Sequence, residues 1–120
     1  MSFASDLQKF SRATGIEIET VVRKLSFEVL KGVTQKTPVD TGRAKANWNL
    51  GYGSINYTIT NATTFRLIMP PKGRGNKIIY ITNSLPYITK LENGSSKQAP
   101  QGMVGLTMND VQRSVRNVVR

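Results

Sequence analysis

The sequence predicts an α+β domain: a long N-terminal helix packed on an antiparallel sheet of about four strands, followed by a short helix and a C-terminal helix. Three patterns support this fold. Apolar residues repeat with a helical period over residues 18–33 and again over residues 106–119, and they alternate as in a strand over residues 55–60. The predicted strands follow one another without intervening helices, which favours an antiparallel sheet. A length of 120 residues fits a single domain, residues 1–120.

The first third of the chain has a helical pattern. A helix is expected from about Asp6, because Ser5 and Gln8 have the spacing of a capping box. Gly15 is a weak point within it. After this glycine, apolar residues recur at three- and four-residue steps, at Ile18, Val22, Leu25, Val29 and Val33. Pro38 ends the helix, since the residue before a proline is disfavoured in the helical conformation.

The middle of the chain has the composition of strands. Four segments are predicted, over residues 44–50, 55–60, 65–69 and 78–82. In the second segment the apolar side chains alternate with polar ones and share one face of the strand. These side chains are Ile55, Tyr57 and Ile59. The stretch between the last two segments is rich in proline and glycine and is expected to form a loop.

The last third is predicted to contain two helices. Pro86 suits the first turn of a short helix that runs to Glu92 and stops at the Asn-Gly pair that follows. Residues 95–102 are polar and are expected to be flexible. The C-terminal helix follows, and Thr107 or Asn109 is expected to cap it.

The net charge of +10 is the strongest feature of the composition, with 17 Lys and Arg residues against 7 Asp and Glu. A charge of this size indicates contact with a polyanion such as DNA, or with acidic protein neighbours. The positive residues are scattered along the chain, which favours acidic proteins as partners. One local cluster, Lys72, Arg74 and Lys77 in the predicted loop, is a candidate for contact with a partner or with DNA.

Enzymatic activity is not expected. The chain has no cysteine and no histidine, so it lacks the commonest nucleophile–base pairs and the commonest zinc ligands. Glu17 and Glu19 are the only acids close together in sequence, and residues two apart on a helix do not face each other. The glycine-rich part of the predicted loop lacks the spacing of a phosphate-binding loop. We therefore expect no catalytic residue, no cofactor and no metal. No apolar run is long enough to span a membrane.

The most informative short segment is TPVDTGRAKANW, residues 37–48. Pro38 stops a helix, Asp40 can accept hydrogen bonds from the amides that follow, and Gly42 can adopt positive φ. Arg43 then leads out of the turn and can pair with a carboxylate. A well-made turn from helix to strand explains this composition without any further function.

This segment also resembles a signature of the tail-completion, or head–tail joining, proteins of long-tailed bacteriophages, a family similar to the lambda minor tail protein Z group. A second segment, NSLPYITKLENGSS at residues 83–96, resembles the family pattern N-x-x-x-Y-x-x-x-L-E-x-G-x-S, and residues 97–103 resemble its continuation. The resemblance extends from about residue 21 to residue 119. Ile88 is a departure, since the family often has alanine there.

The resemblance implies a structural subunit of the virion that assembles in the host cytoplasm as a ring of about six copies at the neck. Its partners would be other copies of itself, the head-side connector or stopper, and the tail tube or terminator. DNA that passes through the ring would contact the subunits only non-specifically. The family has no catalytic residues to transfer, so the motif residues are assigned to the fold or to subunit contact: Thr37, Pro38, Asp40, Thr41, Gly42, Arg43, Trp48, Tyr87, Leu91, Glu92 and Gly94.

Two alternatives remain open at this point. The chain could be a tail terminator, which differs from a completion protein only by its position in the same particle. It could also be a basic nucleic-acid-binding module, in which aromatic residues interleaved with Lys and Arg stack on single strands.

Overall fold

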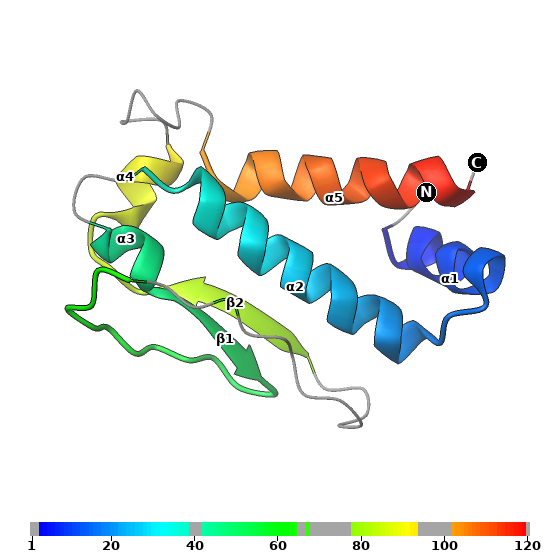
Figure 1. Ribbon diagram of the computed structural model, residues 1–120, viewed down its shortest axis with the longest axis horizontal. Coiled ribbons are helices and arrows are strands. Elements are labelled where there is room, and N and C mark those ends of the chain that lie inside the picture. The colour runs from blue at the N-terminus through cyan, green and yellow to red at the C-terminus, as the bar shows by residue number, and fades with distance from the viewer. Residues whose placement is uncertain (1–2, 39–41, 65–66, 68–77, 94–101, 120) are drawn as a thin grey trace.

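The computed structural model describes residues 3–38, 42–64, 67, 78–93 and 102–119, and Figure 1 shows their arrangement. These residues form five helices and a two-stranded antiparallel sheet. In chain order the elements are α1 (Phe3–Thr14), α2 (Ile18–Lys36), α3 (Arg43–Ala46), β1 (Trp48–Tyr52), β2 (Ile79–Asn83), α4 (Ile88–Glu92) and α5 (Val104–Val119).

The N-terminal helix is divided into two helices. Gly15 has a φ of +71°, which interrupts the helical backbone, and the chain turns so that α1 packs against α5 and α2. The prediction of one long helix was therefore wrong, although Gly15 was its expected weak point. α1 begins at Phe3, ahead of Ser5, so the predicted capping box does not mark its start. α2 ends at Lys36, next to Thr37 and Pro38, as the proline predicted.

The sheet is smaller than predicted, and the expectation of about four strands was wrong. β1 and β2 pair from Trp48 opposite Asn83 to Tyr52 opposite Ile79. The first predicted strand begins instead as the single helical turn α3. Residues 55–60 are not a strand, because their hydrogen bonds go to side chains and not to a backbone ladder. Leu67 is not in a strand, and the rest of the predicted strand 65–69 lies outside the described residues.

The two-stranded sheet lies between α2 and an extended segment, residues 55–64, which we call the clamped segment. α2 covers one face of the sheet, where Trp48 and Ile81 pack against the core around Val33. The clamped segment runs along the other side of the sheet, away from α2 (Figure 1). The chain therefore has three layers here: helix, sheet and extended segment.

The core lies where α2, the sheet, α4 and the start of α5 meet. Its centre is formed by Val33 and Met103, both almost fully buried. Partly buried apolar side chains surround them: Val29, Trp48, Ile81, Ile88 and Leu91. Burial of these side chains supplies most of the driving force for folding in this part of the chain.

α2 and α5 approach each other closely at Gly32. A Cβ atom built on Gly32 would lie 2.6 Å from Cγ2 of Thr107 in α5. Thr107 is buried, and Val111 and Val115 continue the buried side of α5. The glycine therefore permits a helix–helix contact that a larger residue would obstruct.

α1 is fixed to α5 by an ion pair between the two ends of the chain. The carboxylate of Asp6 is buried, and one of its oxygens lies 3.3 Å from Nε of Arg116. A buried carboxylate requires such a partner, because desolvation without compensation is costly. Among the described residues, no helix has the length and apolar content needed to cross a membrane.

Candidate functional site

The two segments that carry the predicted motifs meet at one end of the molecule. The side-chain amide of Asn83 donates a 2.9 Å hydrogen bond to the backbone oxygen of Ala44, and Asn83 is also the strand partner of Trp48. We call this region the motif end: the C-terminal end of α2, with α3, α4 and the start of α5 around it (Figure 1). Segments about 40 residues apart in sequence are thus joined directly.

Thr37 connects the end of α2 to the start of β1. Its hydroxyl accepts a 2.7 Å hydrogen bond from Nε1 of Trp48 and donates one to the backbone oxygen of Val33. Thr37 and Pro38 are both buried. Thr37 and Trp48 therefore form one internal contact between the end of α2 and the start of β1.

Asn47 connects α3 to the clamped segment. It is fully buried, and its side-chain amide exchanges two hydrogen bonds with the backbone of Thr60: Oδ1 accepts from the Thr60 amide at 2.8 Å, and Nδ2 donates to the Thr60 oxygen at 3.0 Å. Nδ2 also donates to the backbone oxygen of Arg43 at 2.8 Å. The side chain thus acts as a peptide group would in a sheet ladder.

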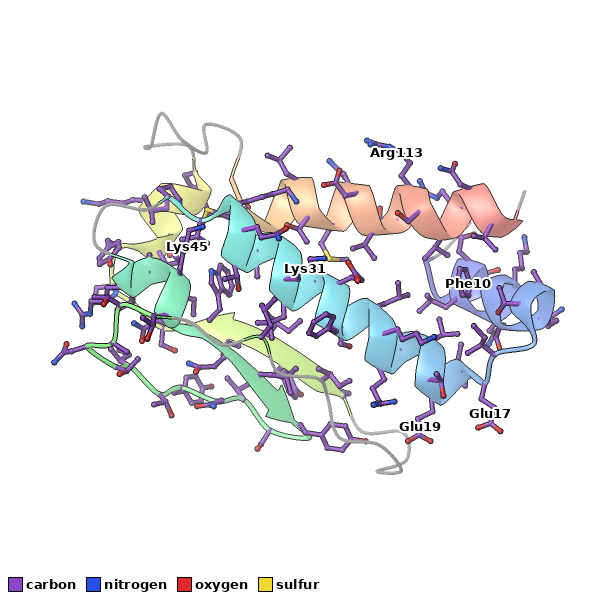
Figure 2. The ribbon with its side chains drawn as sticks, in the orientation of Figure 1. Phe10, Glu17, Glu19, Lys31, Lys45 and Arg113 are labelled. Atoms are coloured by element: carbon purple, nitrogen blue, oxygen red, sulfur yellow. The ribbon has the colours of Figure 1, made fainter. Side chains whose placement is uncertain are left out.

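Gly42 and Arg43 support the same contact. Gly42 has a φ of +81°, and a Cβ atom there would collide with the backbone oxygen of Thr63. Nε of Arg43 donates a 3.3 Å hydrogen bond to the Thr60 oxygen. Lys45 extends from α3 toward α2, where Nζ donates to the backbone oxygen of Gln35 at 3.3 Å (Figure 2). Cationic groups of α3 therefore satisfy carbonyls on both neighbouring segments.

Glu92 caps α5 from the end of α4. One carboxylate oxygen accepts hydrogen bonds from the amides of Met103 and Val104 at 2.8 and 2.9 Å, and the other accepts from the amide of Gly105 at 3.1 Å. A negative charge bonded to the free amides at a helix N-terminus is strongly favoured. The prediction that Thr107 or Asn109 caps this helix was wrong, because α5 already begins at Val104.

The remaining described motif residues divide between core and surface. Leu91 packs against Val33 and Met103 in the core. Tyr87 precedes α4 and is 38% exposed, which makes it the most accessible of the named motif residues for which the structure describes a side chain. Its apolar ring with a polar tip suits a contact between proteins.

Several predicted site residues lie outside the described residues. These are Asp40 and Thr41 in the first motif, Gly94 in the second, and the basic loop residues Lys72, Arg74 and Lys77. Their assignments to the fold or to partner contact stay predictions.

Sequence reasoning missed the importance of Asn47, which was part of the quoted motif but was not selected as a site residue. The available signal was its position directly before a tryptophan at the start of a strand. An asparagine there can bond to backbone that lies beside the strand. Its partner Thr60 is thirteen residues away, so local patterns do not identify the contact.

The acidic side chains of the described residues are dispersed. No group of three acidic side chains lies close enough to hold a metal ion among the residues described. The carboxylate of Glu92 is committed to three backbone amides, and Figure 2 places Glu17 and Glu19 at the N-terminal end of α2, far from the motif end. The polar groups of the motif end thus satisfy the protein's own backbone.

One open groove of about 450 Å³ lies between α2 and α5. It contains the ion pair between Lys36 and Asp110, whose nearest charged atoms are 3.0 Å apart. The hydroxyl of Thr107 also lines the groove and is buried, and it has no hydrogen-bond partner among the described residues. The charged residues that line the groove, Glu28, Lys31, Lys36 and Asp110, sum to no net charge.

No protein-family profile matches the chain, and no curated protein or solved structure is significantly similar to it.

Proposed function

We propose that this protein is a structural subunit of a tailed-bacteriophage virion, assembled as a ring at the head–tail junction, where it completes the tail and joins it to the head connector. Its work is assembly and not chemistry. The proposal rests on the resemblance of residues 37–48 and 83–96 to tail-completion proteins, together with the way in which these two segments interact.

The observation that carries the proposal is the convergence of both segments at the motif end. Asn83 bonds to Ala44, and Glu92 anchors the start of α5. The polar groups of Thr37, Asn47 and Glu92 bond to the backbone or to the partly buried indole of Trp48. These hydrogen bonds hold the motif end in a defined shape and use the polar groups of the three side chains. Such an arrangement suits a building block for an assembly.

The proposed partners are those that the resemblance implies, and the net charge is compatible with them. A chain with a net charge of +10 is attracted to acidic surfaces, which we assign to the head-side connector or stopper and to the tail tube or terminator. Passing DNA would contribute only weak, salt-sensitive contact. Each ring would contain about six copies, with a mass of about 80 kDa for a subunit of 13.3 kDa.

The direct test is to interrupt the gene in a phage that encodes this chain and to image the lysate by electron microscopy. We expect filled heads and separate tails that fail to join, and complementation in trans should restore whole particles. Tails of uncontrolled length would place the protein at the terminator position instead. Normal infectious particles without the protein would contradict the proposal.

The net charge also supports a second candidate, a nucleic-acid-binding module. The two are separated by a salt titration of DNA binding with the purified protein. Micromolar affinity at physiological salt with a steep salt dependence would favour the nucleic-acid-binding function. Weak binding that is lost at physiological salt is expected for the structural subunit.

A further inference from the structure

The clamped segment is held to the sheet through alternate residues only. The backbone oxygens of Asn56 and Thr58 accept hydrogen bonds from the side chains of Thr82 and Asn49, at 2.7 and 2.8 Å. Thr60 is bonded through both its N–H and its C=O to Asn47. In an extended chain, successive backbone groups point in opposite directions. The backbone groups of the even-numbered residues therefore point toward the sheet, and the backbone groups of the odd-numbered residues point away from it.

The odd-numbered residues leave an open backbone edge. Within the part of the chain that the structure describes, neither Tyr57 nor Ile59 has a hydrogen-bond partner for its N–H or its C=O. Backbone groups of this kind are a template for another strand. Hydrogen bonds from the side chains of Asn47, Asn49 and Thr82 keep the segment extended. The edge therefore has this conformation before any partner binds.

The side chains along this edge are apolar and accessible. Tyr57 is 70% exposed, Ile59 is 46% exposed and Ile55 is 39% exposed. Ile78 is 64% exposed, and its backbone oxygen accepts a hydrogen bond from the Gly53 amide, which places it beside the start of the segment. An alternating apolar face that the monomer leaves open to solvent indicates a surface that another protein covers.

The distribution of charge indicates which kind of partner binds to this edge. The ten residues of the clamped segment, 55–64, contain no charged side chain, although one residue in five of the whole chain is charged. Exposed edges are usually protected by lysine or proline, and neither occurs here. Two copies that each carry +10 repel one another wherever their cationic surfaces meet. A neutral edge is the place where a second copy can approach without this repulsion, whereas an acidic partner would gain nothing from it.

We propose that a second copy of this chain docks on the clamped segment and extends it by pairing with the backbone of Tyr57 and Ile59, while Ile55, Tyr57 and Ile59 are covered by the neighbour. This inference deepens the proposed function, on which it rests, because it identifies one surface through which copies of a ring subunit join. A closed ring requires such a contact between each pair of neighbours.

The test compares Ile59→Lys with Val118→Lys in the full chain. Both positions are 46% exposed, and both variants add the same charge to an exposed apolar position, but Val118 lies on α5. Sedimentation is followed from about 1 to 500 µM, where mass action populates assembled species. We expect wild type and Val118→Lys to associate equally, and Ile59→Lys to associate at least about tenfold more weakly. Tyr57→Lys, at a more exposed position, should match Ile59→Lys, and circular dichroism checks that each variant is folded.

A second measurement examines the backbone directly. Amide exchange quenched at low and at high protein concentration should show new protection at Tyr57 and Ile59 in the assembled state. The amide of Thr60, which is already bonded to Asn47, should change little. Equal association of all variants, equal protection of these amides in both states, or a protein that stays monomeric throughout would each overturn the inference. The proposed function is judged separately, by the particles formed when the gene is interrupted.

Discussion

The hydroxyl of Thr37 accepts a 2.7 Å hydrogen bond from the indole nitrogen of Trp48, and this single contact joins the end of α2 to the first residue of β1. Both residues belong to the first motif. Because the hydroxyl also donates to the Val33 oxygen, the helix, the turn and the sheet share one hydrogen-bond chain.

Removal of the Thr37 hydroxyl should destabilise the fold. Thr37→Val keeps the shape of the side chain but leaves the partly buried Trp48 indole nitrogen without an acceptor, so the free energy of unfolding should fall by about 1–3 kcal/mol. Thr37→Ser retains the hydroxyl and is the matched control, with a smaller loss. Trp48 is the only tryptophan, so its fluorescence reports on this contact as well as on unfolding. Equal losses in the two variants would show that the hydrogen bond contributes little.

Neutralising Glu92 should weaken the attachment of α5. Glu92→Gln replaces one oxygen with an NH₂ group that faces backbone donors, so we expect a loss of about 1–2 kcal/mol in urea denaturation. The control is Glu28→Gln in the middle of α2, an exposed position where the change should stay within about 0.5 kcal/mol. Similar values for the two variants would contradict the capping role.

The close contact between α2 and α5 predicts opposite effects at two glycines. Gly32→Ala should destabilise the protein by about 1–3 kcal/mol, because the new methyl group would lie 2.6 Å from Cγ2 of Thr107. Gly105→Ala is the control: its Cβ atom has only an ordinary contact, 3.8 Å from Glu92, so helix propensity should stabilise the protein by up to about 1 kcal/mol.

The same contact can be tested by rescue. Thr107→Ala removes both the obstructing methyl group and a buried hydroxyl that has no partner among the described residues. Combined with Gly32→Ala, it should recover most of the lost stability, and the two changes should be strongly non-additive. Additive effects would mean that Gly32 matters for some reason other than the space that Thr107 occupies.

Loss of Asn47 should release the clamped segment. Asn47→Ala leaves both backbone groups of Thr60 without the bonds that this side chain supplies, and we expect a loss of about 2–3 kcal/mol with faster exchange of the Thr60 amide. Asn49→Ala removes one exposed hydrogen bond, to the Thr58 oxygen, and should cost about 1 kcal/mol or less. If both variants exchange the Thr60 amide at the same rate, Asn47 is not the principal clamp.

Helices were the part of the fold that could be predicted from the sequence. The apolar period located α2 and α5, Pro38 marked the end of α2, and Pro86 marked the approach to α4, because these signals are local. The strand Ile79–Asn83 was also close to its predicted position. The split between α1 and α2 required knowledge of the backbone at Gly15, since a glycine is compatible with both a continuous and an interrupted helix.

The sheet could not be predicted in the same way. Residues 55–60 alternate as a strand does, but alternation says nothing about what satisfies the backbone. Here the partners are the side chains of Asn47, Asn49 and Thr82, the last of them 26 residues from its acceptor. The cap of α5 was missed for a similar reason. Glu92 is supplied by a different helix, whereas the local capping signals at Thr107 and Asn109 lie inside α5.

The ion pair between Asp6 and Arg116 has a practical consequence for experiments on assembly. It holds the first and last helices side by side, and Figure 1 shows that the start of α1 and the end of α5 lie at the same pole of the molecule, opposite α3 and α4. A fluorescent label or an affinity tag placed ahead of α1 or after α5 would therefore lie at this pole. Neither fusion should obstruct Tyr87 or the other accessible groups of the opposite pole, so tagged protein is suited to pull-down of its neighbours.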